Sequence, residues 1–412
     1  MNTRMDCTKL NIGVYCLAPY ARTEAHIKDL ADCGINLVIC MDDDRATLDL
    51  LEKYHIGAII DNAMPGWWGG DGTNAGTMEQ TNPFDTYVKA AENFQDHPAI
   101  WGVSTGDEPS AMDFTYYGKI IDFAEKNYKN QFAYLNLYPN YALNPKGDKE
   151  EIQKGLRTAS YEEYIEAYCK NIVTNYICFD YYMYAATVTG AYDSMNTVAN
   201  ACRRIGRSMW IVLQANSYDP NVFTSENQLR FQAYLAMAFG AECIFWACYT
   251  AGWWYNQVLD STGNKTEQYE KLKRVNQELN TIGSIYMQYR CVDTYFVGNN
   301  RDVCDFCLDD EKQCESLSIG VAEDLHAENG ALLIVGQMKH RKDKDIPDAF
   351  MICAADDPYD LHNQGNVISF RTDAKNVKLY TGTGSVLLYA GSDNVYHFKL
   401  LSCHGALLVA ES

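Results

Sequence analysis

Short apolar runs alternate with longer amphipathic segments from about residue 11 to residue 286. The short runs are rich in β-branched and aromatic residues, and the longer segments repeat apolar residues at spacings of three and four. This alternation is typical of βα units built on a parallel sheet. We expect eight strands, at Asn11–Leu17, Asn36–Met41, Gly57–Asp61, Ile100–Thr105, Phe132–Leu137, Tyr176–Tyr181, Met209–Gln214 and Cys243–Ala247.

Eight amphipathic segments separate and follow these strands, and we expect each to form a helix. They are Glu24–Cys33, Ala46–Tyr54, Phe84–Phe94, Phe114–Tyr128, Tyr161–Ile172, Ser194–Ile205, Ser225–Phe239 and Glu267–Tyr286. Eight units that close on themselves leave no free sheet edge, so the sequence predicts a (β/α)8 TIM barrel. An open doubly wound sheet is the alternative. It would need a glycine-rich phosphate-binding turn after the first strand, where Gly13 is instead followed by Val-Tyr-Cys-Leu-Ala-Pro.

The pattern changes after about Tyr289 to short alternating runs separated by turn residues. Such runs are typical of an antiparallel β-sandwich. We therefore expect two domains, a (β/α)8 barrel over residues 1–288 and a β-sandwich over residues 289–412. The expected strands of the second domain are Asp293–Val297, Leu317–Ala322, Ala331–Gln337, Ala349–Cys353, Asn366–Phe370, Val377–Tyr380, Val386–Tyr389, Val395–Leu400 and Ala406–Val409.

The charge balance narrows the class of ligand. The chain has 34 Lys and Arg against 54 Asp and Glu, which gives a formal net charge of −20. A surface of this charge repels nucleic acid and anionic membranes, so we expect a neutral or cationic small molecule as the partner. The first ten residues lack the apolar core of a secretory signal, and no later segment is a long uncharged apolar run. We therefore expect a cytoplasmic protein.

Fifteen cysteines are spread through the expected strands and helices, and this odd number does not indicate a disulfide framework. We expect most of them to be small, buried apolar residues. Cys304, Cys307 and Cys314 come closest to a metal cluster, but no His follows at a suitable spacing and a fourth ligand is missing. We therefore expect neither a metal nor another cofactor.

The loops after the strands of a parallel barrel converge on one mouth, so we expect the reactive groups there. The residues at these strand ends are carboxylates, amides and aromatic rings. This combination suits a sugar, because rings stack on its faces and polar groups bind its hydroxyls. The candidates for substrate binding are Tyr15, Asp61, Trp67, Trp68, Asn136, Tyr181, Gln214, Trp246, Tyr249 and Trp253.

The motif that points most directly to catalysis is Trp-Gly-Val-Ser-Thr-Gly-Asp-Glu-Pro, residues 101 to 109. Here a strand runs straight into two adjacent carboxylates, and Pro109 ends the strand so that Glu108 is held at the barrel mouth. The neighbouring Asp107 and aromatic walls would raise the pKa of Glu108, as a general acid requires near neutral pH. The alternative is a surface turn whose acids only favour the start of the following helix.

Four segments resemble barrel strands of glycoside hydrolases, and the resemblance covers most of residues 10–285. The segments are Ile100–Pro109, Phe179–Tyr182, Trp210–Gln214 and Ala238–Tyr249. In the large retaining clan with this barrel, the acid/base is a Glu after strand 4 and the nucleophile is a Glu after strand 7. The resemblance therefore implies that Glu108 is the acid/base, whereas the second position holds Gln214.

The missing second carboxylate leaves three possibilities. Asp180 can supply it from strand 6, or Asp61 can act as the base of an inverting mechanism. The third rests on a resemblance of Asp107 and Glu108 to the Asp-Glu dyads of hexosaminidase-type families. That resemblance implies that the acid works with the substrate's own acetamido group while Asp107 orients it. The candidate catalytic residues are thus Glu108, Asp107 and Asp180.

These observations predict a glycoside hydrolase that cleaves short, largely uncharged glycosides or oligosaccharides, with Glu108 as general acid. The alternative is a non-catalytic carbohydrate-binding barrel, which the missing Glu at the position of Gln214 favours. Lyase or aldolase chemistry is disfavoured, because no Lys ends a strand and no His-rich metal set is present among eight histidines.

Overall fold

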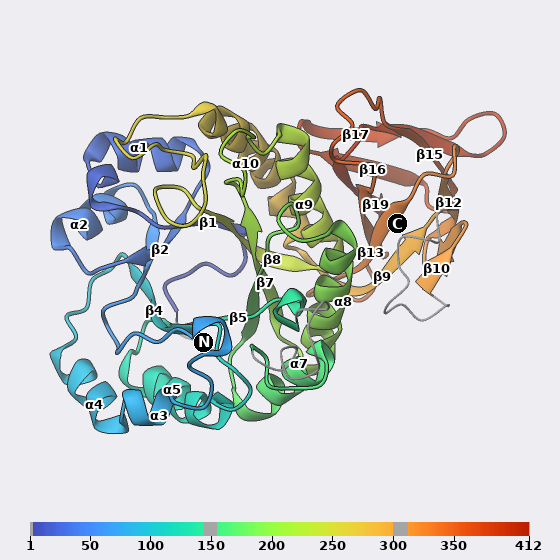
Figure 1. Cartoon of the computed structure of the whole chain (residues 1–412). Coiled ribbons are helices and arrows are strands. Elements are labelled where there is room, and N and C mark those ends of the chain that lie inside the picture. Colours follow the sequence, from blue (N-terminus) through green and yellow to red (C-terminus); the bar gives the residue numbers. More distant parts are fainter. Residues whose placement is uncertain (1–2, 144–154, 300–311, 412) are drawn as a thin grey trace. The chain divides into compact units, whose positions relative to one another are not determined.

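The computed structural model describes residues 3–143, 155–299 and 312–411. Its first eight strands are β1 (Asn11–Tyr15), β2 (Leu37–Met41), β3 (Gly57–Ile60), β4 (Ile100–Asp107), β5 (Phe132–Leu137), β6 (Tyr176–Tyr181), β7 (Ser208–Gln214) and β8 (Ala241–Ala247). They follow one another in sequence order around a closed parallel barrel, in which β1 pairs with both β2 and β8 (Figure 1). The predicted barrel is confirmed, and an open sheet is excluded.

Helices follow the strands, as the apolar spacing predicts. They are α1 (Glu24–Asp32), α2 (Arg45–Lys53), α3 (Met78–Thr81), α4 (Phe84–Asn93), α5 (Phe114–Asn127), α7 (Tyr161–Asn171), α8 (Val188–Ile205), α9 (Glu226–Phe239) and α10 (Glu267–Tyr286). Helices α1 to α5, α7 and α8 lie around the outside of the strands (Figure 1). Helix α8 begins before the expected Ser194, because the Thr187 side chain caps it by accepting a hydrogen bond from Gly190 N.

Large side chains fill the inside of the barrel. The rings of Tyr176 and Trp210 stack with centroids 3.9 Å apart, and Phe132 and Phe245 belong to the same buried cluster. Gly13 leaves the space that the Phe245 ring occupies, since a Cβ atom on Gly13 would lie 2.3 Å from that ring. The interior is therefore a packed core, and a ligand site has to lie at an end of the barrel.

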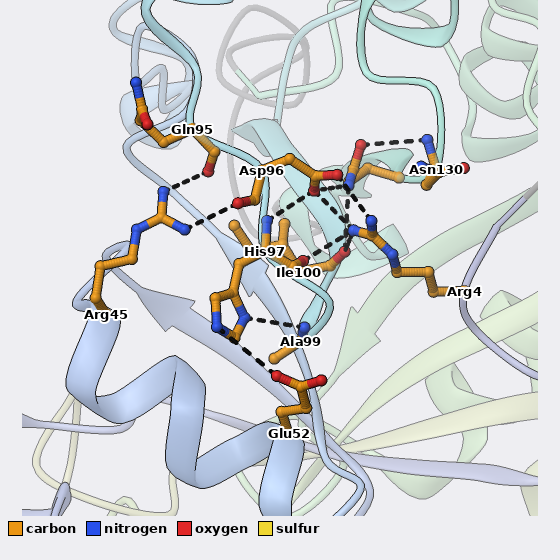
Figure 2. Close-up of polar contacts among 10 residues, drawn as sticks. Arg4, Arg45, Glu52, Gln95, Asp96, His97, Ala99, Ile100 and Asn130 are labelled. Atoms are coloured by element: carbon orange, nitrogen blue, oxygen red, sulfur yellow. Dashed lines mark hydrogen bonds and ion pairs between the residues drawn. The ribbon is translucent and has the colours of Figure 1, made fainter.

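Two arginines anchor the segment that leads into β4 (Figure 2). The Arg4 guanidinium donates to both carboxylate oxygens of Asp96, each at 2.7 Å, and also to the His97 carbonyl oxygen. Arg45 donates to the carbonyl oxygens of Gln95 and Asp96. A bidentate pair between Arg and a carboxylate fixes direction as well as distance, so these contacts hold the start of β4 in place.

Two β-sheets form the C-terminal part of the chain. Their strands are β9 (Tyr289–Val297), β10 (Gln313–Cys314), β11 (Leu317–Ile319), β12 (Ala322–Ala327), β13 (Leu333–His340), β14 (Ala349–Ala354), β15 (Asn366–Arg371), β16 (Asn376–Thr381), β17 (Gly384–Leu388), β18 (Tyr396–Leu400) and β19 (Gly405–Glu411). The larger sheet has the order β10-β9-β13-β14-β19-β16-β17, and the smaller has the order β11-β12-β15-β18. Phe350 and Leu408 of the larger sheet share one buried core with Ile368 and Phe398 of the smaller, so the expected β-sandwich is confirmed.

One expected strand of this sandwich is wrong. The run Leu317–Ala322 is divided into β11 and the start of β12 by a turn at Gly320, where φ is 54°. The two strands pair with each other in an antiparallel hairpin. Gly320 alone marks this turn in the sequence, and the alternating apolar pattern on both sides of it hides the signal.

The chain divides into two compact units. The first comprises Met1–Cys7, Asn11–Val222 and Cys243–Tyr269, and the second comprises Thr8–Leu10, Phe223–Glu242 and Glu270–Ser412. The second unit thus contains α9 as well as the two sheets. Helix α9 packs closely on β13, since a Cβ atom on Gly336 would lie 2.3 Å from the Ala238 carbonyl oxygen. A boundary between separately folding domains near residue 288 remains a prediction.

None of the helices in the described ranges combines the length and the apolar character that a membrane crossing requires. The thirteen cysteines in those ranges are all free. Cys314 lies half-buried in β10, whereas Cys304 and Cys307, the CxxC pair that precedes it, lie outside the described residues.

We predict that Gly13→Ala destabilises the barrel. The added methyl group would overlap the Phe245 ring in a packed interior, and overpacking of this kind costs about 1–3 kcal/mol. Gly66→Ala is the matched control, because a Cβ atom on Gly66 meets nothing within 4 Å. Urea unfolding measures the free energy of unfolding of both variants and the wild type. Equal values for all three proteins would contradict the described packing.

Candidate active site

A cavity of about 400 Å³ opens at the C-terminal ends of the barrel strands. Five residues that the sequence predicts as substrate-binding or catalytic line it: Tyr15, Asp61, Trp67, Trp68 and Asp107. The remaining lining residues are Ile39, Cys40, Gly66, Ser104, Gly106 and Tyr134. Ligands of parallel barrels bind at this end, because the loops after the strands surround it.

The end of β4 has an unusual backbone. Gly106 has a φ of 142° and Glu108 a φ of 47°, both outside the range of ordinary strand residues. The loop after β3 pairs with this strand end, since Asp107 N donates to Trp67 O and Gly69 N donates to Asp107 O, each at 3.0 Å. A left-handed Glu is strained and persists only where its surroundings fix it, which is common at functional sites.

Asn136 of β5 connects Asp107 with Asp180 of β6. Its side-chain nitrogen donates to Asp107 Oδ1 at 3.1 Å and to Asp180 Oδ1 at 2.9 Å. Its side-chain oxygen accepts from the Cys178 thiol at 3.6 Å, and its backbone carbonyl accepts from Glu108 N at 3.0 Å. One residue therefore sets the positions of two carboxyl groups and of the backbone that carries a third.

Burial raises the pKa values of all three carboxyl groups. It raises the pKa of Asp107 to about 6 despite the hydrogen bond from Asn136, and burial followed by the charge of Asp107 raises the pKa of Asp180 to about 7. Burial, then the charges of Asp180 and Asp107, place the pKa of Glu108 well above its usual range. The Trp68 indole N–H donates to Glu108 Oε2 at 3.1 Å and opposes this rise. Glu108 is thus the group that best keeps its proton near neutral pH.

Aromatic rings and a fourth acid complete the wall around these groups. Trp68 is 51% exposed beside Glu108, whereas Trp67 is 9% exposed. The Trp253 ring packs edge-on against Tyr15, with centroids 5.9 Å apart. Burial raises the pKa of Asp61 to about 6, against a hydrogen bond with Ser104. An exposed indole beside hydrogen-bonding carboxyl groups suits a ligand with one apolar face and several hydroxyls.

Two predicted binding residues lie on the outward faces of their strands. Cys178 of β6 and Phe245 of β8 belong to the barrel's inner cluster, so the opposite phase of each strand points outward. Tyr181 follows that outward phase, and its hydroxyl donates to the Thr187 carbonyl oxygen at 3.0 Å. Trp246 also follows the outward phase of its strand, and its side chain is fully buried. The structure therefore does not bring these two rings to the cavity.

Two further predicted residues lie at the end of β7 and just after β8, but they are buried outside the cavity lining. Gln214 lies 1% exposed, where its side-chain oxygen accepts from Tyr184 N and its nitrogen donates to Asn216 O. Tyr249 is fully buried, and its backbone N–H donates to Tyr15 O at 2.9 Å. Both residues support the loops of the barrel mouth.

Residues that the sequence analysis did not single out also belong to this region. Tyr141, in the 3₁₀ helix η3 (Asn140–Leu143), donates its hydroxyl to Asp180 Oδ2 at 3.2 Å. Tyr134 hydrogen-bonds to the Tyr15 hydroxyl at 2.7 Å from inside the barrel. In the sequence, Tyr141 is marked as a site residue only by its position in the loop after β5. Tyr134 follows the apolar pattern of a core strand residue, so the sequence does not distinguish it from the core.

A group of three potential metal ligands lies away from the cavity. Ligand atoms of Asp49, Glu52 and His97 all lie within 4.8 Å of one another. However, His97 Nδ1 accepts a hydrogen bond from Ala99 N at 3.1 Å (Figure 2). A neutral imidazole that accepts at Nδ1 carries its proton on Nε2, which lies 3.1 Å from Asp49 Oδ1 and donates to it. Nε2 then has no lone pair for a metal, so the group anchors the segment before β4.

The sequence matches no protein-family model and no curated protein. Solved structures of glycoside hydrolases do match the fold. An endoglucanase from Pseudomonas stutzeri matches at 12% identity over 64% of this chain and 93% of its own, with a TM-score of 0.44. A β-galactosidase from Marinomonas matches at 10% identity over 68% of this chain and 62% of its own, with a TM-score of 0.46. An intracellular xylanase from Thermoanaerobacterium saccharolyticum matches at 11% identity over 64% and 95%, with a TM-score of 0.40. Similarity at this level transfers neither an activity nor a residue's role to this chain.

We predict that the raised pKa of Asp180 makes stability depend on pH. The folded protein binds this proton more tightly than the unfolded chain, whose Asp pKa is near 3.9. The resulting contribution to stability is fully present below about pH 4 and is lost as the pH rises through about 7, the pKa of Asp180 in the folded protein. Asp180→Asn cannot ionise. Relative to the wild type, it should therefore gain about 3 kcal/mol in free energy of unfolding between pH 5 and pH 8.

Urea unfolding at the two pH values measures this gain. Asp85→Asn is the control, because Asp85 is exposed and its substitution should change the wild-type pH dependence little. A difference between Asp180→Asn and the wild type that stays constant with pH would contradict the raised pKa.

Proposed function

We propose that this protein is a glycoside hydrolase in which Glu108 is the general acid. The observation that carries the proposal is the position of Glu108 directly after β4, where burial and the neighbouring carboxyl groups of Asp180 and Asp107 raise its pKa. A general acid has to hold its proton near neutral pH, and this environment gives Glu108 that property. The exposed Trp68 ring supports the same reading, because it offers a sugar a stacking face next to the acid.

The proposed reaction is cleavage of a glycosidic bond. Glu108 donates its proton to the glycosidic oxygen while the bond from that oxygen to the anomeric carbon breaks. A second carboxylate then either bonds to the anomeric carbon or takes a proton from a water molecule that attacks this carbon. In the first route water later hydrolyses the covalent intermediate, and Glu108 recovers its proton from that water.

Asp180 is the best-supported second carboxylate. Its charge is the largest charge effect on the pKa of Glu108, and its two oxygens accept hydrogen bonds from Asn136 and Tyr141. A carboxylate held at both oxygens is fixed for one direction of attack. This arrangement favours a mechanism with two carboxyl groups over one that depends on a substrate acetamido group. Asp107, bound to the same amide, would then orient the site.

The proposed substrates are short, largely uncharged glycosides or oligosaccharides. The volume of about 400 Å³ lies in the usual range of small-ligand pockets. The formal charge of −20 and the acidic groups at the mouth disfavour anionic sugars. Tyr15, Asp61 and Trp67 line the cavity and are proposed to contact the sugar, with Trp253 beside them.

A non-catalytic carbohydrate-binding barrel is the second candidate, because Gln214 occupies the strand 7 position and its amide is engaged by the backbone. A panel of nitrophenyl glycosides that includes N-acetylhexosaminides separates the two candidates. Hydrolysis of at least one member supports the enzyme. Binding of free sugars without hydrolysis of any member supports the binding protein.

We predict that Glu108→Gln abolishes most turnover and leaves binding nearly intact. The amide keeps the shape of the side chain but has no acidic proton, and general acid catalysis contributes about 10²- to 10⁴-fold. kcat on the best glycoside and the Kd of a product sugar measure the two effects. Glu79→Gln, at an exposed surface position, is the control and should match the wild type. Unchanged kcat in Glu108→Gln would rule out Glu108 as the acid.

We predict that Trp68→Phe moves the alkaline limb of the pH–rate profile to higher pH. The Trp68 N–H stabilises ionised Glu108 and so lowers its pKa, and Phe keeps a ring but removes this donor. Activity needs protonated Glu108, which then persists to higher pH. kcat against pH for the variant and the wild type measures the shift. An alkaline limb that moves to lower pH would contradict the assignment.

A further inference from the structure

Three cysteines lie in one row across neighbouring strands at the barrel mouth. Cys16 follows the last paired residue of β1, and Cys40 follows that residue's partner on β2. The register of β1 with β8 likewise brings Cys248 beside Cys16. Neighbouring strands lie roughly 4.8 Å apart, which falls within the roughly 4.4–6.8 Å between Cα atoms that a disulfide needs. Cys16 is therefore the middle member, with a potential disulfide partner on each side.

The backbone turns two of these thiols towards the cavity. The side chain of Tyr15 lies in the inner cluster, so regular alternation would put the following Cys16 on the outer face. However, Cys16 has a φ of 69° and Cys40 a φ of 58°, left-handed values that residues other than glycine rarely adopt. Both thiols consequently pack against the inner cluster, and Cys40 lines the cavity. Strain of this kind is common at functional sites.

Both neighbouring thiols interact with the Cys16 thiol. The thiols of Cys248 and Cys40 hydrogen-bond to Cys16 and hold its pKa well below the usual range, against burial. Hydrogen bonding with Cys16 and burial raise the pKa of Cys40. Gly252 leaves room for the group, since a Cβ atom there would lie 2.8 Å from the Cys248 sulfur and 3.3 Å from the Cys16 sulfur. Because Cys16 lies between two thiols that can donate hydrogen bonds to it, its thiolate is favoured over those of its neighbours, which makes Cys16 the nucleophile of the row.

We propose that Cys16 and Cys40 form a reversible thiol–disulfide site that reacts with low-molecular-weight disulfides. Both side chains are half-buried and within reach of the cavity, whereas Cys248 is buried beside Cys16. Metal binding fits the row less well. In the described ranges, the group of three ligand atoms close enough to share an ion is that of Asp49, Glu52 and His97, and the three cysteines do not form such a group. The inference does not depend on the proposed glycosidase activity, since it rests on the thiols alone.

The reaction consists of two exchange steps. The Cys16 thiolate attacks one sulfur of the small disulfide, a mixed disulfide forms, and one small thiolate leaves. Cys40 then loses its proton to solvent and attacks the Cys16 sulfur, which displaces the second small thiolate. The two protein thiols have lost two electrons and two protons, and the two released small thiols carry them. Because Cys40 also hydrogen-bonds to Asp61, the product would alter the cavity wall.

Incubation with oxidised glutathione, followed by mass-spectrometric mapping of unreduced peptides, tests the proposal. We expect a peptide pair linked through Cys16 and Cys40 that dithiothreitol separates. Cys16→Ser and Cys40→Ser should both prevent this link. Cys169→Ser is the matched control, because Cys169 is also half-buried but lies on α7, and it should form the link at the wild-type rate.

Cys248→Ala gives a second readout. Removing one thiol donor to Cys16 should slow the exchange at pH 6 by about 3- to 10-fold without stopping it. A structural role alone would not change this rate. Linkage of Cys16 to Cys248 in the wild type would overturn the proposal. So would glutathione attached to Cys7 or Cys169 while Cys16 stays reduced. The wild-type map decides the question even where a serine variant fails to fold.

Discussion

The two hydrogens of one amide, that of Asn136, bind two different carboxyl groups, and the rest of the barrel mouth depends on this contact. Burying several carboxyl groups together is unfavourable unless they are hydrogen-bonded or neutral. Asn136 provides hydrogen bonds to Asp107 and Asp180, while burial and these neighbours favour the protonated form of Glu108. The division into one proton holder and two hydrogen-bonded acids follows from burial together with that single side chain. It is the physical basis of the proposed acid catalysis.

The barrel positions these groups, but the chemistry lies where its regular geometry ends. Strand pairing and a packed interior fix the direction of every strand. A rigid frame of this kind holds the functional groups at the strand ends in fixed positions. At or next to the ends of three strands the backbone departs from the strand conformation, with positive φ values at Glu108, Cys16 and Cys40. Each departure re-aims one reactive side chain. The carboxyl group and the thiols therefore reach the mouth by the same structural device.

The sequence predicts the barrel well, because apolar periodicity survives along each strand and helix. It also brings Asp107 and Asp180 to one end, since both close parallel strands. It does not predict which of two adjacent residues faces inward, so it predicts Tyr181 as well as its inward neighbour Asp180. A left-handed Cys16 leaves no mark in an apolar pattern, because the conformation results from tertiary contacts. Tyr141 reaches Asp180 from a loop, where periodicity gives no direction.

Barrel closure also has a consequence for the synthesis of the chain. Strand β1 pairs with β8, so that Asn11 lies opposite Cys243. A ribosome adds roughly 5–20 residues per second, so β1 waits on the order of ten seconds or more before its partner is made. During that time one edge of an apolar parallel strand has no partner and can pair with another nascent chain. The yield of folded protein therefore depends on whether this edge is kept from pairing with other chains until β8 has left the ribosome.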